Sequence, residues 1–350
     1  MEYVKLGRSD LRVSKVCLGT MTWGKQNTQA DADRQIEYAL KKGINFIDTA
    51  EMYAIPPSAE TYGKTESIIG NWLARNPGKR KEIVLATKIA GNGISWIRGG
   101  ADVTGAAIIS SVDASLERLQ TDHIDLYQIH WPNRSSPHFG KHWPGQLTFT
   151  DVDAVQNSEQ MLDILEALST CIKAGKIRHC GLSDETPWGI NEYLRLSDKH
   201  DLPRMISIQN EFNLLHSKDW PYLVENCVMN EVAYLPWSPL AGGALTGKYM
   251  NGALPAGARW TMSQRNGIFR DKAHSHEAIT AYKGVADKYN MSVAALSLAW
   301  CNQVNGVTAT IIGATSMAQL EEDIAAFEVT LSEEILADIL AVLNDYPAPF

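Results

Sequence analysis

The sequence predicts an α/β fold in which eight parallel strands alternate with helices and close into a barrel. Short apolar runs alternate with amphipathic segments along the 350 residues, which is typical of a parallel sheet covered by helices. The turn after the first apolar run, residues 19–24 (GTMTWG), lacks the GxGxxG pattern that a doubly wound open sheet would carry there. A (β/α)8 or TIM barrel is therefore expected, as a single domain over residues 1–350.

The expected elements follow in chain order. Residues 3–15 are expected to form a hairpin that turns at residues 7–10 and covers one end of the barrel. The expected strands are short apolar runs at 16–19, 46–50, 83–88, 126–130, 179–183, 206–210, 233–238 and 310–314. The expected helices are apolar at three- and four-residue spacing and include 32–42, 65–74, 106–119, 158–174, 187–199 and 276–289. Ser292 and Ser332 are expected to cap two later helices.

Three segments are long for connections inside a compact domain, namely residues 91–104, 132–156 and 249–275. Loops of this length are usually functional or mobile. In a barrel they are expected to stand at the C-terminal face of the sheet, where they would wall the functional site.

Composition excludes several function classes. The formal net charge of -8 argues against a broad nucleic-acid surface, although it is compatible with a local anion pocket. The five cysteines have no CxxC spacing, so buried, reduced thiols are expected rather than disulfides or a zinc site. There is no signal-like N-terminal segment and no apolar run long enough to span a bilayer. We therefore expect a cytoplasmic protein that binds neither nucleic acid nor membrane, and a homo-oligomer is compatible with the sequence.

Four polar side chains near the ends of neighbouring strands suggest chemistry. Asp48 and Lys88 lie at the ends of the second and third strands, Tyr53 follows Asp48 in a loop, and His130 ends the fourth strand. A buried lysine needs an anionic partner, which Asp48 can supply. Because a cation lowers the pKa of a nearby phenol, Lys88 is expected to tune Tyr53 as a general acid or base. His130 could donate a hydrogen bond that orients a substrate oxygen.

Each of these residues also has a structural explanation. Asp48 could be a cap, Tyr53 a surface aromatic, Lys88 a lysine whose stem is buried and whose charge reaches solvent, and His130 a core histidine. Their joint position at one rim of the barrel favours the functional interpretation.

The later strand ends predict a pocket for a large planar ligand. Ser183, Asp184 and Gln209 offer hydrogen bonds that could fix an amide-bearing ring, and Trp237 could stack on such a ring.

The same region predicts a place for phosphate groups. Small residues at 241–243 let the backbone approach a pyrophosphate, and Lys248 and Arg259 could carry its charge. Residues 313–316 precede a helix whose N-terminus could bind a phosphate, and Glu322 suits amino or hydroxyl groups.

Taken together, these segments resemble the aldo-keto reductase family. The resemblance runs from the N-terminal hairpin to Asp323, and Asp48, Tyr53, Lys88 and His130 match the family's catalytic tetrad in order and context. The motifs that carry it are IDTAEMY, LATK, YQIHWP, GLSDE, IQNEF, WSPLAGGALTGKY and IIGATSMAQLEEDI. The Trp-Ser-Pro-Leu and Gly-Ala-Thr segments resemble the branch shared by bacterial NADP(H)-dependent reductases and potassium-channel β subunits.

The resemblance implies an NADPH cofactor that lies across the barrel mouth and reduces an aldehyde or ketone, with Tyr53 as the proton donor. The implied cofactor contacts are Ser183, Asp184, Gln209 and Trp237 for the nicotinamide; Gly19, Thr20, Met21 and Asp48 for its ribose; Ser238, Leu240, Lys248 and Arg259 for the pyrophosphate; and Gly313, Thr315, Gln319, Glu322 and Asp323 for the adenosine and its 2′-phosphate.

Some positions depart from the family's pattern. Asp184 and Asp323 stand where asparagines are usual, and a carboxylate at position 184 can accept from the carboxamide but cannot donate to it. Thr315 and Gln319 stand where many members have lysine and arginine, so the preference for NADP over NAD is less strongly implied.

The substrate is expected to contact Trp23, Tyr53, His130 and Trp131, and no metal is expected. Trp96, Phe139 and Trp143 could also line an aromatic pocket for flat or hydrophobic carbonyls, or all these rings could anchor loops.

Two other function classes remain as alternatives. The chain could be a cofactor-binding sensor or interaction module with little turnover. It could also be a metal-dependent barrel hydrolase built on His130, His138 and His142, although these histidines lie in or beside one loop rather than on several strand ends.

Overall fold

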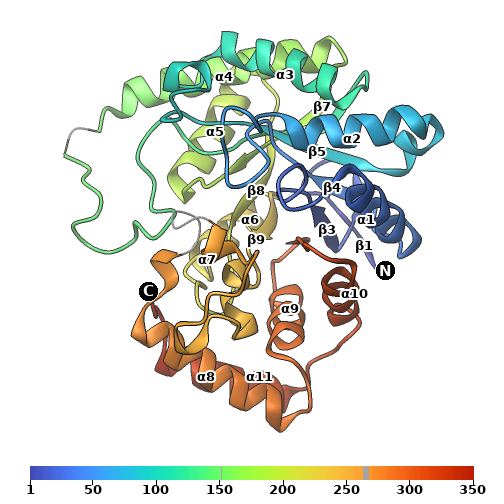
Figure 1. Ribbon diagram of the computed structural model, residues 1–350. Helices are drawn as coiled ribbons and strands as arrows, with labels where there is room; N and C mark the ends of the chain where they lie inside the picture. Colours follow the sequence, from blue (N-terminus) through green and yellow to red (C-terminus); the bar gives the residue numbers. More distant parts are fainter. Residues whose placement is uncertain (151, 263–267) are drawn as a thin grey trace.

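The computed structural model describes residues 1–150, 152–262 and 268–350, and its centre is an eight-stranded parallel sheet (Figure 1). The order of the strands is β10-β3-β4-β5-β6-β7-β8-β9, so strands that are neighbours along the chain are neighbours in the sheet. Their bounds are β3 (Val16–Gly19), β4 (Phe46–Asp48), β5 (Val84–Ile89), β6 (Ile124–Ile129), β7 (Ile177–Ser183), β8 (Met205–Glu211), β9 (Ala233–Trp237) and β10 (Thr310–Ile312).

The sheet closes through the segment that leads into β10. Thr310 of β10 lies opposite Val16 of β3, which joins the last strand to the first. On the other side, the Thr308 N–H donates to the Tyr234 carbonyl of β9 at 2.9 Å, and Val307 forms a parallel bridge with Tyr234. The expected (β/α)8 barrel is therefore confirmed.

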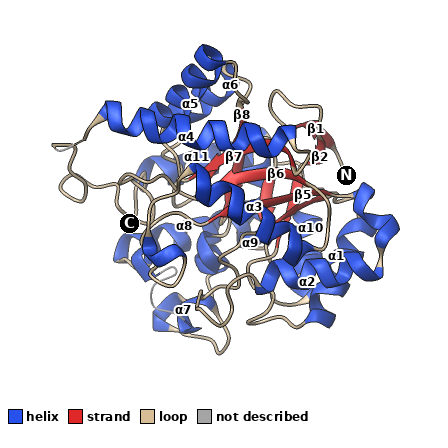
Figure 2. Cartoon of the chain, turned by 90° about the horizontal axis from the view of Figure 1, so that it is seen from above, coloured by secondary structure: helices blue, strands red, loops and turns tan. Residues whose placement is uncertain are grey.

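Helices surround the strands on all sides, as the view from above in Figure 2 shows. Their bounds are α1 (Gln29–Lys41), α2 (Lys64–Arg75), α3 (Gly105–Leu119), α4 (Ala154–Lys173), α5 (Pro187–His200), α6 (Tyr222–Met229), α7 (Arg259–Met262), α8 (Ala273–Lys288), α9 (Val293–Gln303), α10 (Met317–Ala326) and α11 (Glu333–Asp345). None of the helices within the described ranges is both long and apolar enough to cross a bilayer.

Helix starts follow their capping residues. Ser292 and Ser332 accept hydrogen bonds from the Ala295 and Ile335 N–H groups, as the sequence predicts. The start of α4 was expected at residue 158 but lies at residue 154, because the Asp153 carboxylate accepts from two N–H groups of the first turn.

The N-terminal hairpin, β1 (Tyr3–Lys5) and β2 (Arg12–Ser14), closes the barrel end opposite the strands' C-terminal ends. Leu6, Leu11 and Val13 pack with Cys17, Phe46 and seven further strand residues of the barrel interior, so the lid predicted for residues 3–15 is present. A β-carbon on Gly7 would lie 2.2 Å from the Ile206 carbonyl oxygen, so only glycine fits at this contact.

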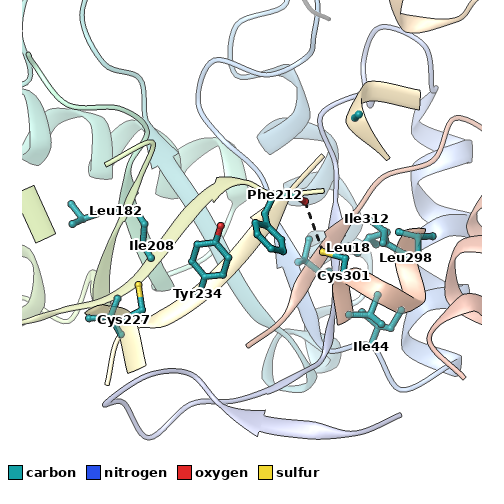
Figure 3. Close-up of a cluster of buried hydrophobic side chains, with 14 of the residues drawn as sticks. Leu18, Ile44, Leu182, Ile208, Phe212, Cys227, Tyr234, Leu298, Cys301 and Ile312 are labelled. Carbon is teal, nitrogen blue, oxygen red and sulfur yellow. Dashed lines mark hydrogen bonds between the residues drawn. The ribbon is translucent and has the colours of Figure 1, made fainter. Parts of the chain in front are cut away.

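The core between the barrel and its helices contains interlocked aromatic and aliphatic side chains (Figure 3). Phe212 stacks on Trp300 with ring centroids 5.4 Å apart and meets Tyr234 edge-on. Cys227 and Cys301 lie in the same core, and all five cysteines are buried and free of disulfides. This packing fixes β8 and β9, whose last residues form part of the site.

Several strand ends differ from their predicted bounds. Residues 49–50, 130, 238 and 313–314 lie just beyond strands rather than inside them, since ladder pairing stops before the turn toward the next helix. The segment predicted as a long loop at 249–275 contains α7 and two short 3-10 turns, Met250–Gly252 and Ile268–Arg270. Its residues 263–267 lie outside the described residues, as does residue 151 of the segment 132–156.

Candidate active site

A cavity of about 490 Å³ opens at the C-terminal ends of the barrel strands. Its walls combine strand ends with the loops after β4, β6 and β9 and with the first turns of α10. All the residues expected to contact a cofactor line it: Gly19, Thr20, Met21, Asp48, Ser183, Asp184, Gln209, Trp237, Ser238, Leu240, Lys248, Arg259, Gly313, Thr315, Gln319, Glu322 and Asp323. The structure thus brings distant segments of the sequence together in one cavity.

A buried ion pair lies beneath this cavity, with Asp48 but not Lys88 among the lining residues. The Lys88 ammonium donates to an Asp48 carboxylate oxygen at 2.6 Å and to the Thr49 carbonyl at 2.8 Å. The side chain of Lys88 is fully buried and that of Asp48 nearly so, which excludes the surface-lysine explanation. Burial alone would lower the pKa of Lys88, but Asp48, together with Tyr53 and Cys17, more than offsets this, so its pKa lies above the ordinary value.

Tyr53 lies directly beside this pair. Its ring centroid is 5.2 Å from the Lys88 ammonium. Burial raises the pKa of Tyr53, and the opposing effect of Lys88 is weakened by the negative charge of Asp48. The expected effect of Lys88, which lowers the pKa of Tyr53, is present, but burial outweighs it, so the net pKa lies above the ordinary value. The phenol keeps its proton at neutral pH, as a proton donor must.

His130 completes the group from the turn after β6. Its ring lies edge-on to that of Tyr53 with centroids 5.7 Å apart. Burial, with a smaller effect of Lys88, lowers the pKa of His130 well below its ordinary value. The imidazole is therefore neutral at physiological pH, and its buried Nδ1 has no hydrogen-bond partner within the described part of the chain.

One end of the cavity offers polar groups and an aromatic face. The Gln209 amide donates to Asp48 at 3.0 Å, which connects this end to the ion pair. The indole N–H of Trp237 donates to the Asp184 carboxyl at 3.1 Å. Burial, and then the nearby negative charges of Glu211 and other carboxyls, raise the pKa of Asp184 well above its ordinary value despite that hydrogen bond. The Asp184 carboxyl is therefore harder to ionise than an ordinary aspartate.

The loop after β9 supplies positive charge. Lys248 and Arg259 both line the cavity, and the buried Nε of Arg259 has no partner among the described residues. Burial, then repulsion by Arg270, lowers the pKa of Arg259 to about 10, so a ligand anion here would relieve an unfavourable arrangement. Gly243 has φ of +93°, and a β-carbon there would lie 2.7 Å from the Lys248 ammonium. The glycine at position 243 therefore makes room for the Lys248 side chain.

The other end of the cavity is formed by the start of α10. Ser316 caps this helix, and Thr315 donates through both its backbone N–H and its hydroxyl to Gln319 at 2.9 Å. Asp323 is buried, and burial followed by repulsion from Glu322 raises its pKa to about 7.

The expected substrate residues divide into two groups. Trp131 lines the cavity beside His130, with ring centroids 5.0 Å apart, and its indole N–H donates to the Asn92 carbonyl. Trp23 is not a lining residue, and its assignment to the substrate site is wrong. Its ring is fully buried, and its N–H donates to Gln35 of α1 at 2.9 Å, so it is a core residue that holds a loop to a helix.

Comparison with known proteins now decides the family. The Aldo/keto reductase family pattern matches residues 15–344. Protein tas of Escherichia coli (strain K12) is 42% identical over 354 residues, which cover 100% of each chain. The chain belongs to the aldo/keto reductase family. Two relatives are more distant. Uncharacterized oxidoreductase YrpG of Bacillus subtilis (strain 168) is 32% identical over 100% of this chain and 97% of its own length. A probable voltage-gated potassium channel subunit beta of Arabidopsis thaliana is 28% identical over 99% of this chain and 98% of its own length.

Membership gives the reaction class. Aldo/keto reductases are NAD(P)-dependent oxidoreductases that act on carbonyl compounds, and this chain has the cavity and the polar groups for such a reaction. Within the described residues, no group of three or more His, Cys, Asp or Glu side chains is arranged to bind a metal ion. His138 and His142 contact Asp184 and Phe350 instead.

The sequence analysis missed two features of this reductase. Gln128 donates to Asp48 at 3.2 Å and lies two residues before His130 on β6, so the two-residue alternation of a strand could have identified it. Arg270, which lines the cavity, forms a buried ion pair with Glu211. Glu211 lies in the IQNEF motif, but nothing in the sequence indicates its pairing with an arginine 59 residues further on.

Proposed function

We propose that this chain is an NADPH-dependent reductase of small aldehydes or ketones, with Tyr53 as the general acid. One observation carries the proposal: Tyr53, whose phenol keeps its proton, His130, whose imidazole is neutral, and Asp48, which is paired with the buried Lys88, line one cavity of about 490 Å³.

The cavity fits a nicotinamide dinucleotide in the chemistry of its walls. Trp237 offers an aromatic face, and Ser183, Asp184 and Gln209 would hold the carboxamide. Asp184 is harder to ionise than an ordinary aspartate, and in its protonated form it could both donate to and accept from the carboxamide. When bound, the cofactor supplies the hydride that the carbonyl carbon accepts.

Two cations support binding of the cofactor's phosphates. Lys248 and Arg259 would neutralise them, and the glycine conformations in residues 242–243 allow the backbone to approach closely. Thr315, Gln319 and the N-terminus of α10 would meet the adenosine end. We propose that this helix N-terminus, which can bind the 2′-phosphate that only NADPH carries, favours NADPH over NADH.

Side chains of this protein position the carbonyl oxygen and donate a proton to it. His130 donates a hydrogen bond that positions the carbonyl oxygen, and the Tyr53 hydroxyl gives its proton to that oxygen as negative charge develops there. Lys88 stabilises the phenolate that remains, and Asp48, held by Lys88, Gln128 and Gln209, keeps the ammonium in place.

A panel of aldehydes and ketones with NADPH and NADH tests the proposal by the loss of reduced-cofactor absorbance. Repeated turnover of 4-nitrobenzaldehyde, with kcat/KM about tenfold or more higher for NADPH than for NADH, is expected.

The Arabidopsis relative is named as a channel subunit, so a sensing role is the competing function. Oxidation of one equivalent of bound cofactor without further turnover would favour that role over an enzyme.

A further inference from the structure

The inner turn of the loop between β6 and α4 reaches the cavity. His138 is buried, and its Nδ1 lies 3.6 Å from an Asp184 oxygen, beyond hydrogen-bond distance. The Trp237 indole N–H donates to the same oxygen, so Asp184 lies between this loop and Trp237.

The next residue, Phe139, has a backbone conformation and a side-chain exposure that do not favour folding. Its backbone is left-handed, with φ of 56°, which is unfavourable for a large residue. Its side chain is 54% exposed, so it gains little from burial. Its ring lies 5.7 Å from that of Trp237 and lines the cavity. A ligand that covered Phe139 would supply the missing apolar contact.

The turn is fixed on both sides of Phe139. On one side stands the contact of His138 with Asp184. On the other, Gly140 has φ of +79°, and a β-carbon there would lie 2.9 Å from the ring of Phe269. His142 contacts the Phe350 carbonyl at 2.8 Å. Phe139 is thus held at the cavity wall by its neighbours, not by its own packing.

Phe139 and Trp131 give the catalytic end of the cavity two aromatic walls. The Trp131 ring adjoins His130, which in turn adjoins Tyr53, while Phe139 adjoins Trp237. The apolar residues Met52, Ile55 and Phe269 also line the cavity. A space bounded in this way suits a flat, uncharged carbonyl compound, because aromatic faces bind planar apolar groups best.

We propose that Phe139 is a specificity-determining residue that selects flat aromatic carbonyl substrates, and that His138, buried beside Asp184, is the positioning residue that holds this turn of the loop, and with it Phe139, at the cavity. This inference rests on the proposed reductase function and names the substrate class of the same site.

Substrate selectivity tests the role of Phe139. Wild type, Phe139→Ala and Phe139→Tyr are compared with 4-nitrobenzaldehyde and with propanal, both with NADPH. Phe139→Ala is expected to lower kcat/KM about tenfold for the aromatic aldehyde, mainly through KM, with a much smaller change for propanal. Phe139→Tyr should restore most of the selectivity. The control is Phe149→Ala, since Phe149 lies in the same loop, is 72% exposed and does not line the cavity.

A double-variant cycle tests the role of His138. His138→Ala should lose as much selectivity for the aromatic aldehyde as Phe139→Ala does. The double variant should lose little more, because both changes remove the same aromatic wall of the cavity. Calorimetric binding of benzyl alcohol to the NADP+-loaded protein gives a second readout that needs no turnover, and Phe139→Ala should weaken it.

The outcomes separate the inference from the proposed function. If wild type reduces both aldehydes and the selectivity ratio is unchanged in Phe139→Ala, the inference is overturned and the reductase function stands. If His138→Ala and Phe139→Ala have fully additive effects, the positioning role of His138 is overturned. If wild type turns over neither aldehyde with either cofactor, the proposed function fails and the inference fails with it.

Discussion

The Lys88 ammonium lies 2.6 Å from an Asp48 carboxylate oxygen, and the lysine side chain is fully buried. An ion pair in this position is costly to break, because removal of one partner leaves the other charge buried and uncompensated. The pair therefore matters for folding as well as for the site.

Asp48→Ala is expected to lower the free energy of unfolding by about 3–5 kcal/mol in urea denaturation. The control is Asp33→Ala, which breaks the more exposed Arg75–Asp33 pair and should cost about 1 kcal/mol or less. Equal losses of unfolding free energy in the two variants would mean that the buried pair stabilises the protein no more than the exposed pair does.

Gly91 sets the position of Trp131. A β-carbon at Gly91 would lie 2.0 Å from the Trp131 indole nitrogen, so Gly91→Ala must displace the ring. We expect a several-fold rise in KM for aldehydes with little change in the Kd of NADPH, measured by steady-state kinetics and by fluorescence titration. Gly78→Ala is the matched control, since a β-carbon there meets nothing within 4 Å. A change in NADPH affinity alone would contradict the assignment of Trp131 to the substrate side.

Asp323 makes stability depend on pH. Burial raises its pKa from 3.8 to about 7, so between these values the folded protein binds more protons than the unfolded chain. The contribution of Asp323 to stability therefore falls as the pH rises through this window and is most unfavourable above pH 7, by an amount on the order of a few kcal/mol.

Asp323→Asn should accordingly raise the Tm of the protein without added cofactor, and by more at pH 8 than at pH 5. Thermal denaturation at the two pH values measures this, with the exposed Glu328→Gln as the control. A gain of the same size at both pH values would rule out titration of Asp323 as the cause.

The barrel and the tetrad could be predicted because they rest on local patterns. Apolar runs mark strands, and the C-terminal ends of parallel strands meet at one edge, so Asp48, Lys88 and His130 had to converge if the strands were correct. The cofactor-lining residues followed from the same rule and from the family resemblance.

Other features depend on contacts that a sequence does not encode locally. Trp23 was assigned to the substrate site, but a hydrogen bond to Gln35 places it in the core. The pKa of Tyr53 depends on a balance between burial and two opposite charges, which requires coordinates to evaluate. The turn at Phe139 is set by contacts with Asp184 and Phe269, both distant along the chain.

The role of Tyr53 is tested most directly by Tyr53→Phe, measured for kcat with 4-nitrobenzaldehyde and for the Kd of NADPH. The substitution removes the hydroxyl and leaves the ring beside Lys88, so kcat should fall by roughly 10²–10⁴-fold while the Kd stays within about twofold of wild type. Retention of wild-type kcat in Tyr53→Phe would contradict the account, because the proton would then come from another group.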